Sequence, residues 1–316
     1  MAGGQERALR RRIRSVESTK KITRAMELIA ASRIQRAQQR VAAARPYAEL
    51  LTQAIQNLAR AGGGAAGHPL LATRERVQTV AFVVVTADRG LAGGYNSGVI
   101  RTAERALQAE VAAGRDYMLI LAGKKAESYF RFRHYRIEAA YNGFSEQPDY
   151  EHARDIARLV MDRFTDEQVD QVQLVYTQFL SVGAQRVVNR TFLPLQTANL
   201  EGAEPEGTAA SYEFEPSPEV ILERLLPRYV ESRLFDAFLE AAASEHAARQ
   251  RAMKSATDNA EELIKALSRQ MNRARQDAIT TEIMEIVSGA EALSKSGHEV
   301  TRVDVGAVSP ELEDQR

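Results

Sequence analysis

The feature that most constrains the fold is a long stretch near the start of the chain without glycine. Residues 8–61 contain no glycine and only one proline, Pro46, so they can form one continuous helix. At about 1.5 Å per residue, roughly 50 residues of helix extend for about 75 to 80 Å, well beyond an ordinary globular helix. Because proline lacks an amide hydrogen, we expect Pro46 to kink this helix or to break its hydrogen-bond ladder locally.

Apolar residues in the second half of this stretch alternate between spacings of three and four, which is the pattern of a coiled-coil seam. In the first half a seam starts at Leu9, but the apolar spacing slips before Ile22 and again before Ile34. A narrow stripe with small alanines favours a single close helical partner. The regular row consists of Ile34, Ala37, Val41, Ala44, Ala48, Leu51, Ile55 and Leu58.

A second helical pattern near the other end of the chain supplies a candidate partner. Helical periodicity returns beyond Pro227 and lasts to about residue 293, with one glycine, Gly289. Two terminal segments separated by a compact insert can pair within one chain only in antiparallel fashion, and each alone would leave its stripe in water. We therefore expect residues 1–61 and 218–293 to form a long antiparallel α-helical coiled coil. Its best second seam is Ala260, Leu263, Leu267, Met271, Ala274 and Ala278.

Between these ends the pattern changes to alternating strands and helices. A β-branched strand, a glycine-rich loop, a helix and a second apolar strand together predict one βαβ unit. Residues 75–198 are therefore expected to form a central α/β domain with a Rossmann-like mixed sheet. The expected strands lie at 77–86, 117–121, near 135–139, 169–181 and 186–196, the last two as a hairpin, and the expected helices at 96–113, 124–130 and 149–164.

Charge and composition narrow the function. The formal charges cancel, with 42 basic and 42 acidic residues, but residues 5–45 carry twelve basic and three acidic residues. This local excess implies a partner of opposite sign, and without interleaved aromatic residues an acidic protein is favoured over nucleic acid. Residues 199–217 are expected to be an acidic loop, and residues 294–316 a disordered tail.

No cysteine is present, which excludes disulfides, thiolate metal sites and cysteine nucleophiles. No apolar run approaches the roughly 20 residues that cross a bilayer, so any work at a membrane is expected to be peripheral.

Few residues suggest chemistry. The loop at residues 87–96 lies between a strand and a helix, where Rossmann-type domains bind phosphate, but it lacks the G-x-G-x-x-G spacing. A structural turn is therefore favoured over a nucleotide site. The five histidines are scattered without metal-ligand spacing. Glu282 and Glu285 share a helix face, and a solvated or partner-facing surface is favoured over acid–base chemistry.

Four segments then become specific to a family. Residues 12–33 read RIRSVESTKKITRAMELIAASR, residues 87–96 ADRGLAGGYN, residues 229–234 YVESRL and residues 273–290 RARQDAITTEIMEIVSGA. In this order they closely resemble the gamma subunits of F-type ATP synthases over about residues 1–293. Ala92 stands where many members carry a cysteine, and the tail beyond residue 293 exceeds the usual family end.

The resemblance implies a non-catalytic rotor shaft. In the family, the two terminal helices penetrate a hexamer of three alpha and three beta subunits, while the α/β domain binds the epsilon subunit and the membrane-embedded c-subunit ring, with a delta subunit in the same complex. Proton flow turns the ring, and the shaft drives the catalytic beta subunits through their binding states. No cofactor is implied, and a bacterial setting at the cytoplasmic face of the plasma membrane is expected.

The resemblance also implies site residues, carried over by position. Beta-subunit contacts are expected at Arg24, Met26, Arg33, Arg275, Gln276, Thr280 and Glu285. A foot near epsilon and the c ring is expected at Tyr212, Phe214 and Glu215. Two other classes of protein stay open on the residues alone: a free-standing coiled-coil adapter that binds an acidic protein, and a nucleotide-dependent enzyme centred on the loop at residues 90–94.

Overall fold

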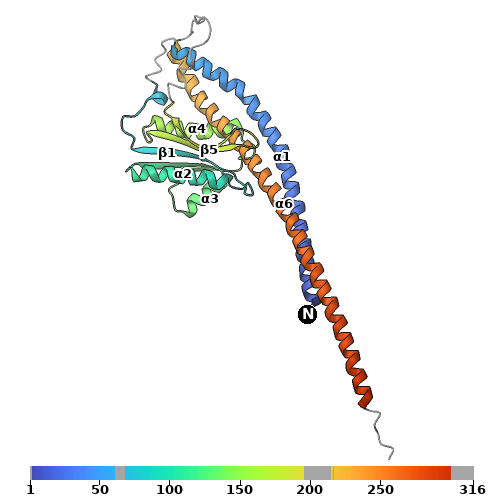
Figure 1. Ribbon diagram of the computed structural model, residues 1–316. Helices are drawn as coiled ribbons and strands as arrows, with labels where there is room; N and C mark the ends of the chain where they lie inside the picture. Colours follow the sequence, from blue (N-terminus) through green and yellow to red (C-terminus); the bar gives the residue numbers. More distant parts are fainter. Residues whose placement is uncertain (1, 61–67, 196–214, 216, 300–316) are drawn as a thin grey trace, which may run out of the picture. The chain divides into compact units, whose positions relative to one another are not determined.

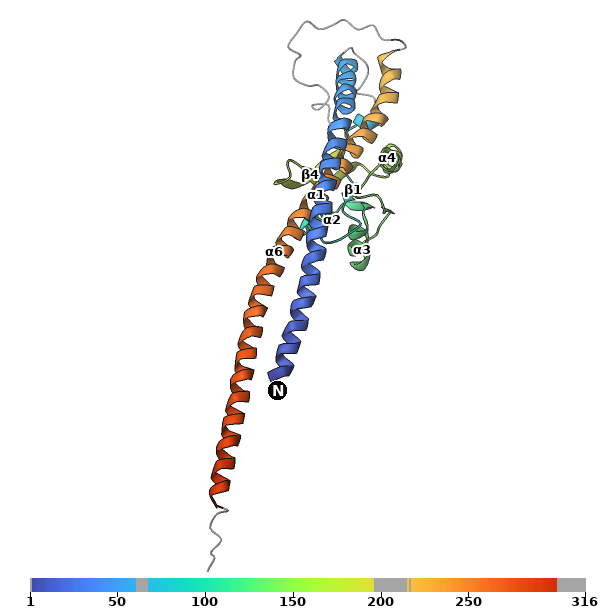
Figure 2. The same cartoon turned by 90° about the vertical axis from the view of Figure 1, so that its right-hand side faces the viewer.

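A computed structural model describes residues 2–60, 68–195, 215 and 217–299 of this chain. Two units are distinguished: one comprises Met1–Lys21 and Asp258–Arg316, and the other comprises Ile22–Thr257. The two terminal helices, α1 (Ala2–Arg60) and α6 (Pro218–Glu299), contribute to both units. Each unit contains a stretch in which α1 and α6 run side by side (Figures 1 and 2).

The central domain is a five-stranded sheet with strand order β3-β2-β1-β4-β5. Strand β1 pairs in parallel with both β2 and β4, β2 pairs in parallel with β3, and β5 is antiparallel to β4. The predicted mixed sheet, βαβ unit and terminal hairpin are confirmed. The strands are β1 (Thr79–Val85), β2 (Asp116–Ala122), β3 (Ala139–Tyr141), β4 (Gln171–Phe179) and β5 (Gln185–Leu193), and the other helices are η2 (Pro69–Leu71, a 3-10 turn), α2 (Tyr95–Ala112), α3 (Lys124–Phe132) and α4 (Tyr150–Thr165).

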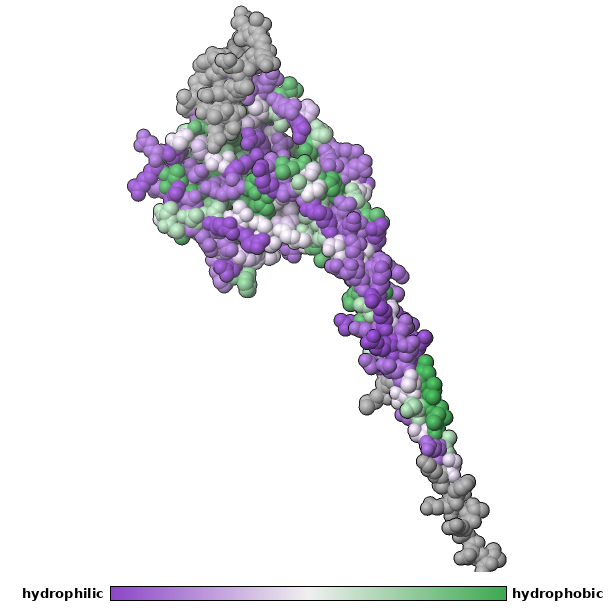
Figure 3. Space-filling view, in the orientation of Figure 1, coloured by the Kyte–Doolittle hydropathy of each residue, from purple (hydrophilic) through white to green (hydrophobic). Residues whose placement is uncertain are grey.

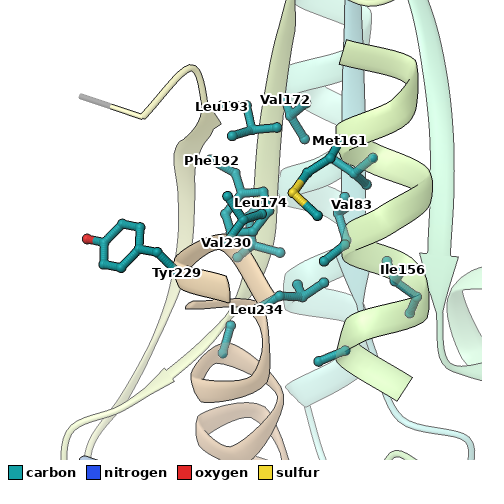
Figure 4. Close-up of a cluster of buried hydrophobic side chains, with 14 of the residues drawn as sticks. Val83, Ile156, Met161, Val172, Leu174, Phe192, Leu193, Tyr229, Val230 and Leu234 are labelled. Carbon is teal, nitrogen blue, oxygen red and sulfur yellow. The ribbon is translucent and has the colours of Figure 1, made fainter. Parts of the chain in front are cut away.

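Helices cover both faces of the sheet, which explains why β1 is apolar and buried at every position after Thr79. Val80, Phe82 and Val84 point to the face under α2 and α3, whereas Ala81 and Val83 belong to the opposite core. That second core brings α4 together with the first part of α6, as the cluster around Leu174, Phe192 and Val230 shows (Figure 4). Therefore α6 is an integral part of the domain as well as of the helix pair.

One strand was placed wrongly from the sequence. The weak strand expected near residues 135–139 is β3 at Ala139–Tyr141. Tyr135 instead packs its ring edge-on against Phe130, at 5.3 Å between centroids, and the Arg136 backbone amide donates to the Tyr117 hydroxyl at 3.1 Å. Side-chain packing therefore takes the first part of this segment out of the sheet.

One of the two long helices extends further than expected. Helix α1 runs from Ala2 to Arg60, within the expected residues 1–61, whereas α6 runs from Pro218 to Glu299, past the expected end at residue 293. Both contain an internal proline, Pro46 and Pro227, without interruption. A proline removes one hydrogen bond from a ladder of many, and Figure 1 shows α1 as a curved rather than a broken helix.

The seam of α1 does not slip, which corrects the sequence interpretation. Every position that continues the three-four spacing back from Ile34 is buried or half-buried, including the polar Lys20, Thr23 and Glu27. Ile22 and Ile29, which the apolar pattern placed in the seam, are 61% and 54% exposed. Polar residues thus continue the register where apolar residues stop. The full row is Leu9, Ile13, Val16, Lys20, Thr23, Glu27, Ala30, Ile34, Ala37, Val41, Ala44, Ala48, Leu51, Ile55 and Leu58.

The seam of α6 needs one correction. Leu263 is 40% exposed, and Ile264 is half-buried in its place, so the spacing runs through Ala260, Ile264 and Leu267. Leu263 and Ile264 are adjacent apolar residues, and apolar identity alone does not show which of them faces the partner helix. The remaining expected positions, Met271, Ala274 and Ala278, are half-buried as the seam predicts.

The two helices pair in antiparallel fashion. In the 22–257 unit, the Thr23 and Thr257 hydroxyls lie 2.8 Å apart, whereas Leu58 shares a core with Leu226. The early part of α1 therefore meets the later part of α6, and its end meets the start of α6. In the other unit the Lys20 ammonium lies 3.1 Å from the Glu261 carboxylate.

Candidate functional site

The three partner-contact residues expected on α1 have different surroundings. The Arg24 side chain is 58% exposed and its Nη1 donates to both carboxylate oxygens of Glu27, at 3.0 and 2.9 Å. Met26 is half-buried. Arg33 is turned toward the α/β domain, where its guanidinium donates to the Glu146 carboxylate. Arg24 and Met26 thus keep surface exposed to solvent, and Arg33 pairs with a residue of the same chain.

The four residues expected on α6 all lie on exposed helix surface. Arg275, Gln276, Thr280 and Glu285 are exposed, and the Thr280 hydroxyl donates to the Gln276 carbonyl at 3.0 Å. Within the described residues, Arg275 and Glu285 make no ion pair. Two exposed charged side chains, neither of which has an ion-pair partner among the described residues, are suited to contact with another molecule.

Sequence reasoning missed an apolar surface on the same part of α6. Large apolar side chains there are about half or more exposed, and Figure 3 shows the hydrophobic patch that they form. Soluble monomers rarely leave such a contiguous patch in water, so the patch indicates a covering partner. Its members are Ile279, Ile283, Met284, Ile286, Val287 and Leu293. The signal was present in the sequence as apolar residues on more than one side of the helix.

The predicted foot can be followed at one position only. Glu215 is exposed and lies three residues before α6 begins. Tyr212 and Phe214 lie outside the described residues.

The glycine-rich loop at residues 87–96 is closed by its own side chains. The Ala87 amide donates to Asn96 Oδ1 at 2.9 Å, and the Asn96 amide group donates to the Arg89 carbonyl at 3.4 Å. The Asp88 carboxylate accepts from the Lys124 backbone amide at 3.0 Å, at the start of α3. A helix N-terminus favours an anion, and at α3 that position is already taken by the Asp88 carboxylate. The negative charge of Asp88 would repel a phosphate. This geometry favours a structural turn.

The same loop attaches the domain to α6. Tyr95, which is buried, donates its hydroxyl to the Ala241 carbonyl at 3.2 Å, and burial holds the pKa of that phenol well above its usual range. Ser244 likewise donates its hydroxyl to the Thr177 carbonyl at 3.1 Å. These two hydrogen bonds join the start of α2 and the strand β4 to the same side of α6.

A cluster of charged groups, hereafter the junction cluster, joins the loop between β3 and α4 to both long helices. It consists of Arg33, Arg89, Glu146, Glu245, His246 and Arg249. Burial lowers the pKa of His246 to about 4, so the imidazole is neutral near pH 7. One neutral tautomer satisfies both ring nitrogens, because Nε2 can donate to the Glu146 carbonyl at 3.3 Å while Nδ1 accepts from Arg249 at 3.4 Å.

Within the part of the chain that the structure describes, no group of three or more His, Cys, Asp or Glu side chains could hold a metal ion. No described helix combines the length and apolar character that a membrane span requires.

Comparison with known proteins gives the family. The family model described as ATP synthase matches residues 5–293 of the chain. The chain belongs to the ATP synthase gamma-chain family. The ATP synthase gamma chain of Frankia casuarinae is 52% identical over 295 residues, covering 92% of this chain and 98% of that protein. The gamma chain of Acidothermus cellulolyticus is 47% identical over 301 residues, covering 94% of this chain and 100% of that protein.

Solved structures of two mitochondrial ATP synthases contain chains with this fold. A chain in the Euglena gracilis mitochondrial ATP synthase, in a structure of OSCP, F1 and the c ring, superimposes with a TM-score of 0.65 at 17% identity, covering 98% of this chain and 100% of that chain. A chain in the Tetrahymena thermophila mitochondrial central stalk and c ring gives a TM-score of 0.57 at 24% identity, covering 74% and 99%. A gamma chain of ATP synthase is one subunit of an enzyme complex, and the expected fold class is confirmed.

Proposed function

We propose that this chain is the central rotor shaft of a proton-translocating ATP synthase. The observation that carries the proposal, beside family membership, is the dual use of α6. Its first part lies in the core of the α/β domain, and the same uninterrupted helix, 82 residues long in all, exposes an apolar patch toward its other end. A helix that is anchored in a domain at one end and can contact the surrounding alpha3-beta3 hexamer at the other is suited to the transmission of torque.

In this proposal the shaft itself is not a catalyst. Its exposed residues bias the states of catalytic beta subunits in an alpha3-beta3 hexamer, and ATP is made there. The basic surface of α1 would face acidic groups of those subunits, as electrostatic complementarity requires. The contact residues are Arg24, Met26, Arg33, Arg275, Gln276, Thr280 and Glu285, to which the exposed apolar residues of α6 are added.

The α/β domain would carry the connection to the proton-driven ring. We assign Tyr212, Phe214 and Glu215 to a foot near the epsilon subunit and the c-subunit ring. The delta subunit would belong to the same complex without being a direct partner of the shaft. The setting proposed is peripheral, at the cytoplasmic face of a bacterial plasma membrane.

Co-expression with the alpha and beta subunits of the same source tests this function. After purification through a tag on beta, native mass spectrometry should find one copy of this chain for three alpha and three beta subunits. If the hexamer assembles and this chain stays outside it, the rotor proposal fails and a free-standing adapter becomes the better description. The mass of the intact complex distinguishes the two outcomes directly.

A further inference from the structure

The junction cluster centres on one carboxylate. Glu146 lies in the loop between β3 and α4, and three guanidinium groups from three other parts of the chain converge on it. Arg33 of α1 donates to Oε2, Arg89 of the β1–α2 loop lies 3.6 Å from Oε2, and Arg249 of α6 lies 3.4 Å from Oε1. We propose that Glu146 is the positioning residue that holds the α/β domain in place on the two long helices. This inference rests on the rotor function proposed above.

Burial makes the cluster sensitive to the loss of this carboxylate. The Arg249 side chain is 7% exposed and also pairs with Glu245, at 2.5 Å, whose side chain is 1% exposed. The cluster holds three arginines and two carboxylates, so removing the Glu146 charge leaves three cations facing one anion. Arg33 and Arg89 are 36% and 71% exposed and stay hydrated, but the buried Arg249 cannot regain water without moving, and the loop that carries residue 146 is then displaced from α1 and α6.

Helix α1 contacts the loop between β3 and α4 at a second point. Arg40 lies seven residues after Arg33 and therefore on the same side of the helix. Its guanidinium donates to the Pro148 carbonyl and, at 3.1 Å, to the Asp149 carboxylate. Arg40 reaches only the end of the loop, whereas Glu146 links the loop to α1 and α6 together.

The contact between domain and helices combines an apolar core with polar contacts such as Tyr95–Ala241 and Arg40–Asp149, each of which reaches one helix only. Apolar packing is non-directional, so it resists separation better than it resists sliding. A carboxylate shared by guanidinium groups on both helices fixes direction as well as distance. Under torque, Glu146 would keep the domain and the helix pair turning as one body.

The test replaces the carboxylate by its uncharged isostere in the assembled complex. With Glu146→Gln in a complete ATP synthase reconstituted into vesicles, we expect assembly and ATP hydrolysis to persist and the protons pumped per ATP hydrolysed to fall about twofold to tenfold. Glu138→Gln is the matched control, because Glu138 also pairs with an arginine, Arg163 at 2.7 Å, but entirely within the domain. Pumping by Glu146→Gln equal to that of the control overturns the inference.

A chemical bridge separates positioning from a general structural defect. The chain has no cysteine, so Arg33→Cys with Glu146→Cys introduces the only two thiols that it contains. In a complex whose other subunits lack reactive cysteines, the double variant should lose coupling and regain it when a short bismaleimide joins the two thiols. A cross-linked complex that stays uncoupled means that Glu146 acts in some other way, and the inference is then wrong.

The proposed function and this inference fail in different ways. If the complex with the unaltered chain assembles without that chain, the rotor proposal falls before Glu146 is tested. If that complex pumps protons and Glu146→Gln pumps equally well, only the role of Glu146 falls.

Discussion

Single residues on α6 show how the surroundings set ionisation in the helix pair. Asp236 lies in a crevice of about 340 Å³ between α1 and α6. Burial, reinforced by the neighbouring Glu240 carboxylate, raises the pKa of Asp236 to about 6. The arginines that face it, Arg233 of α6, Arg190 of β5 and Arg45 of α1, oppose this rise only in part. Near pH 7 the fold therefore holds a poorly hydrated charge.

The sign of this effect gives a prediction for Asp236→Asn. The carboxyl pKa is higher in the folded chain than in the unfolded one, so the ionised group lowers the free energy of unfolding most above about pH 6. This destabilisation disappears below about pH 4, where the carboxyl is protonated in both states. The variant should unfold a few degrees higher than the unaltered chain at pH 7.5, with the gap closing by pH 4. Thermal unfolding followed by circular dichroism measures this. An exposed substitution on the same helix, Asp258→Asn, serves as control, and a midpoint at pH 7.5 no higher than normal contradicts the prediction.

A second residue-scale prediction concerns Gly123, which joins β2 to α3. Its φ of +108° disfavours any side chain, and an added Cβ would lie 2.2 Å from the Thr86 carbonyl oxygen. We expect Gly123→Ala to destabilise the domain by about 3 kcal/mol or more, since strain and a backbone clash combine. Gly114→Ala has a positive φ of +76° but open space around it, and should cost much less. Urea unfolding of both variants is the measurement, and equal losses would contradict the role of the clash.

At the scale of elements, the polar stretch of the α1 seam yields a double-mutant prediction. Thr257 also donates its hydroxyl to the Met253 carbonyl at 2.8 Å, so the Thr257 side chain is bonded both within α6 and across to α1. Thr257→Val should cost about 1 to 3 kcal/mol, because it removes the buried bond between the two hydroxyls. Adding Thr23→Val to that variant should cost less than Thr23→Val alone, because the bond is already lost. Unfolding free energies of the single and double variants give the coupling, and strict additivity would contradict the prediction.

The elements also show what the sequence could and could not predict. Apolar spacing over residues 34–58 and the βαβ pattern predicted the helix pair and the mixed sheet, because burial dictates those patterns. Polar seam residues such as Thr23 gave no apolar signal, so the seam seemed to slip. The surroundings of the candidate site residues were harder to predict: the sequence did not show that Arg33 pairs with Glu146, 113 positions away in the chain. Periodicity identifies the buried face of a helix and leaves open which distant loop supplies a counter-charge.

For the molecule as a whole, the prediction concerns coupling through the exposed side of α1. Met26 is half-buried beside the Arg24–Glu27 pair. In the proposed complex, Met26→Lys would add a cation to this crowded, already basic stretch, and we expect fewer protons pumped per ATP hydrolysed in reconstituted vesicles. The same charge at the exposed Gln38, outside the predicted contact residues, should have a smaller effect. Unchanged pumping with Met26→Lys would mean that Met26 is placed wrongly.

The antiparallel pairing of the chain ends also affects biosynthesis. Thr23 and its partner Thr257 are separated by 234 positions, and ribosomes add roughly 5 to 20 residues per second. The part of α6 that packs on Thr23 is therefore synthesised on the order of 10 to 50 s after Thr23 itself. During that time a long amphipathic helix leaves the ribosome with nothing to pack against. Nascent chains of this protein should consequently depend on chaperones until α6 emerges.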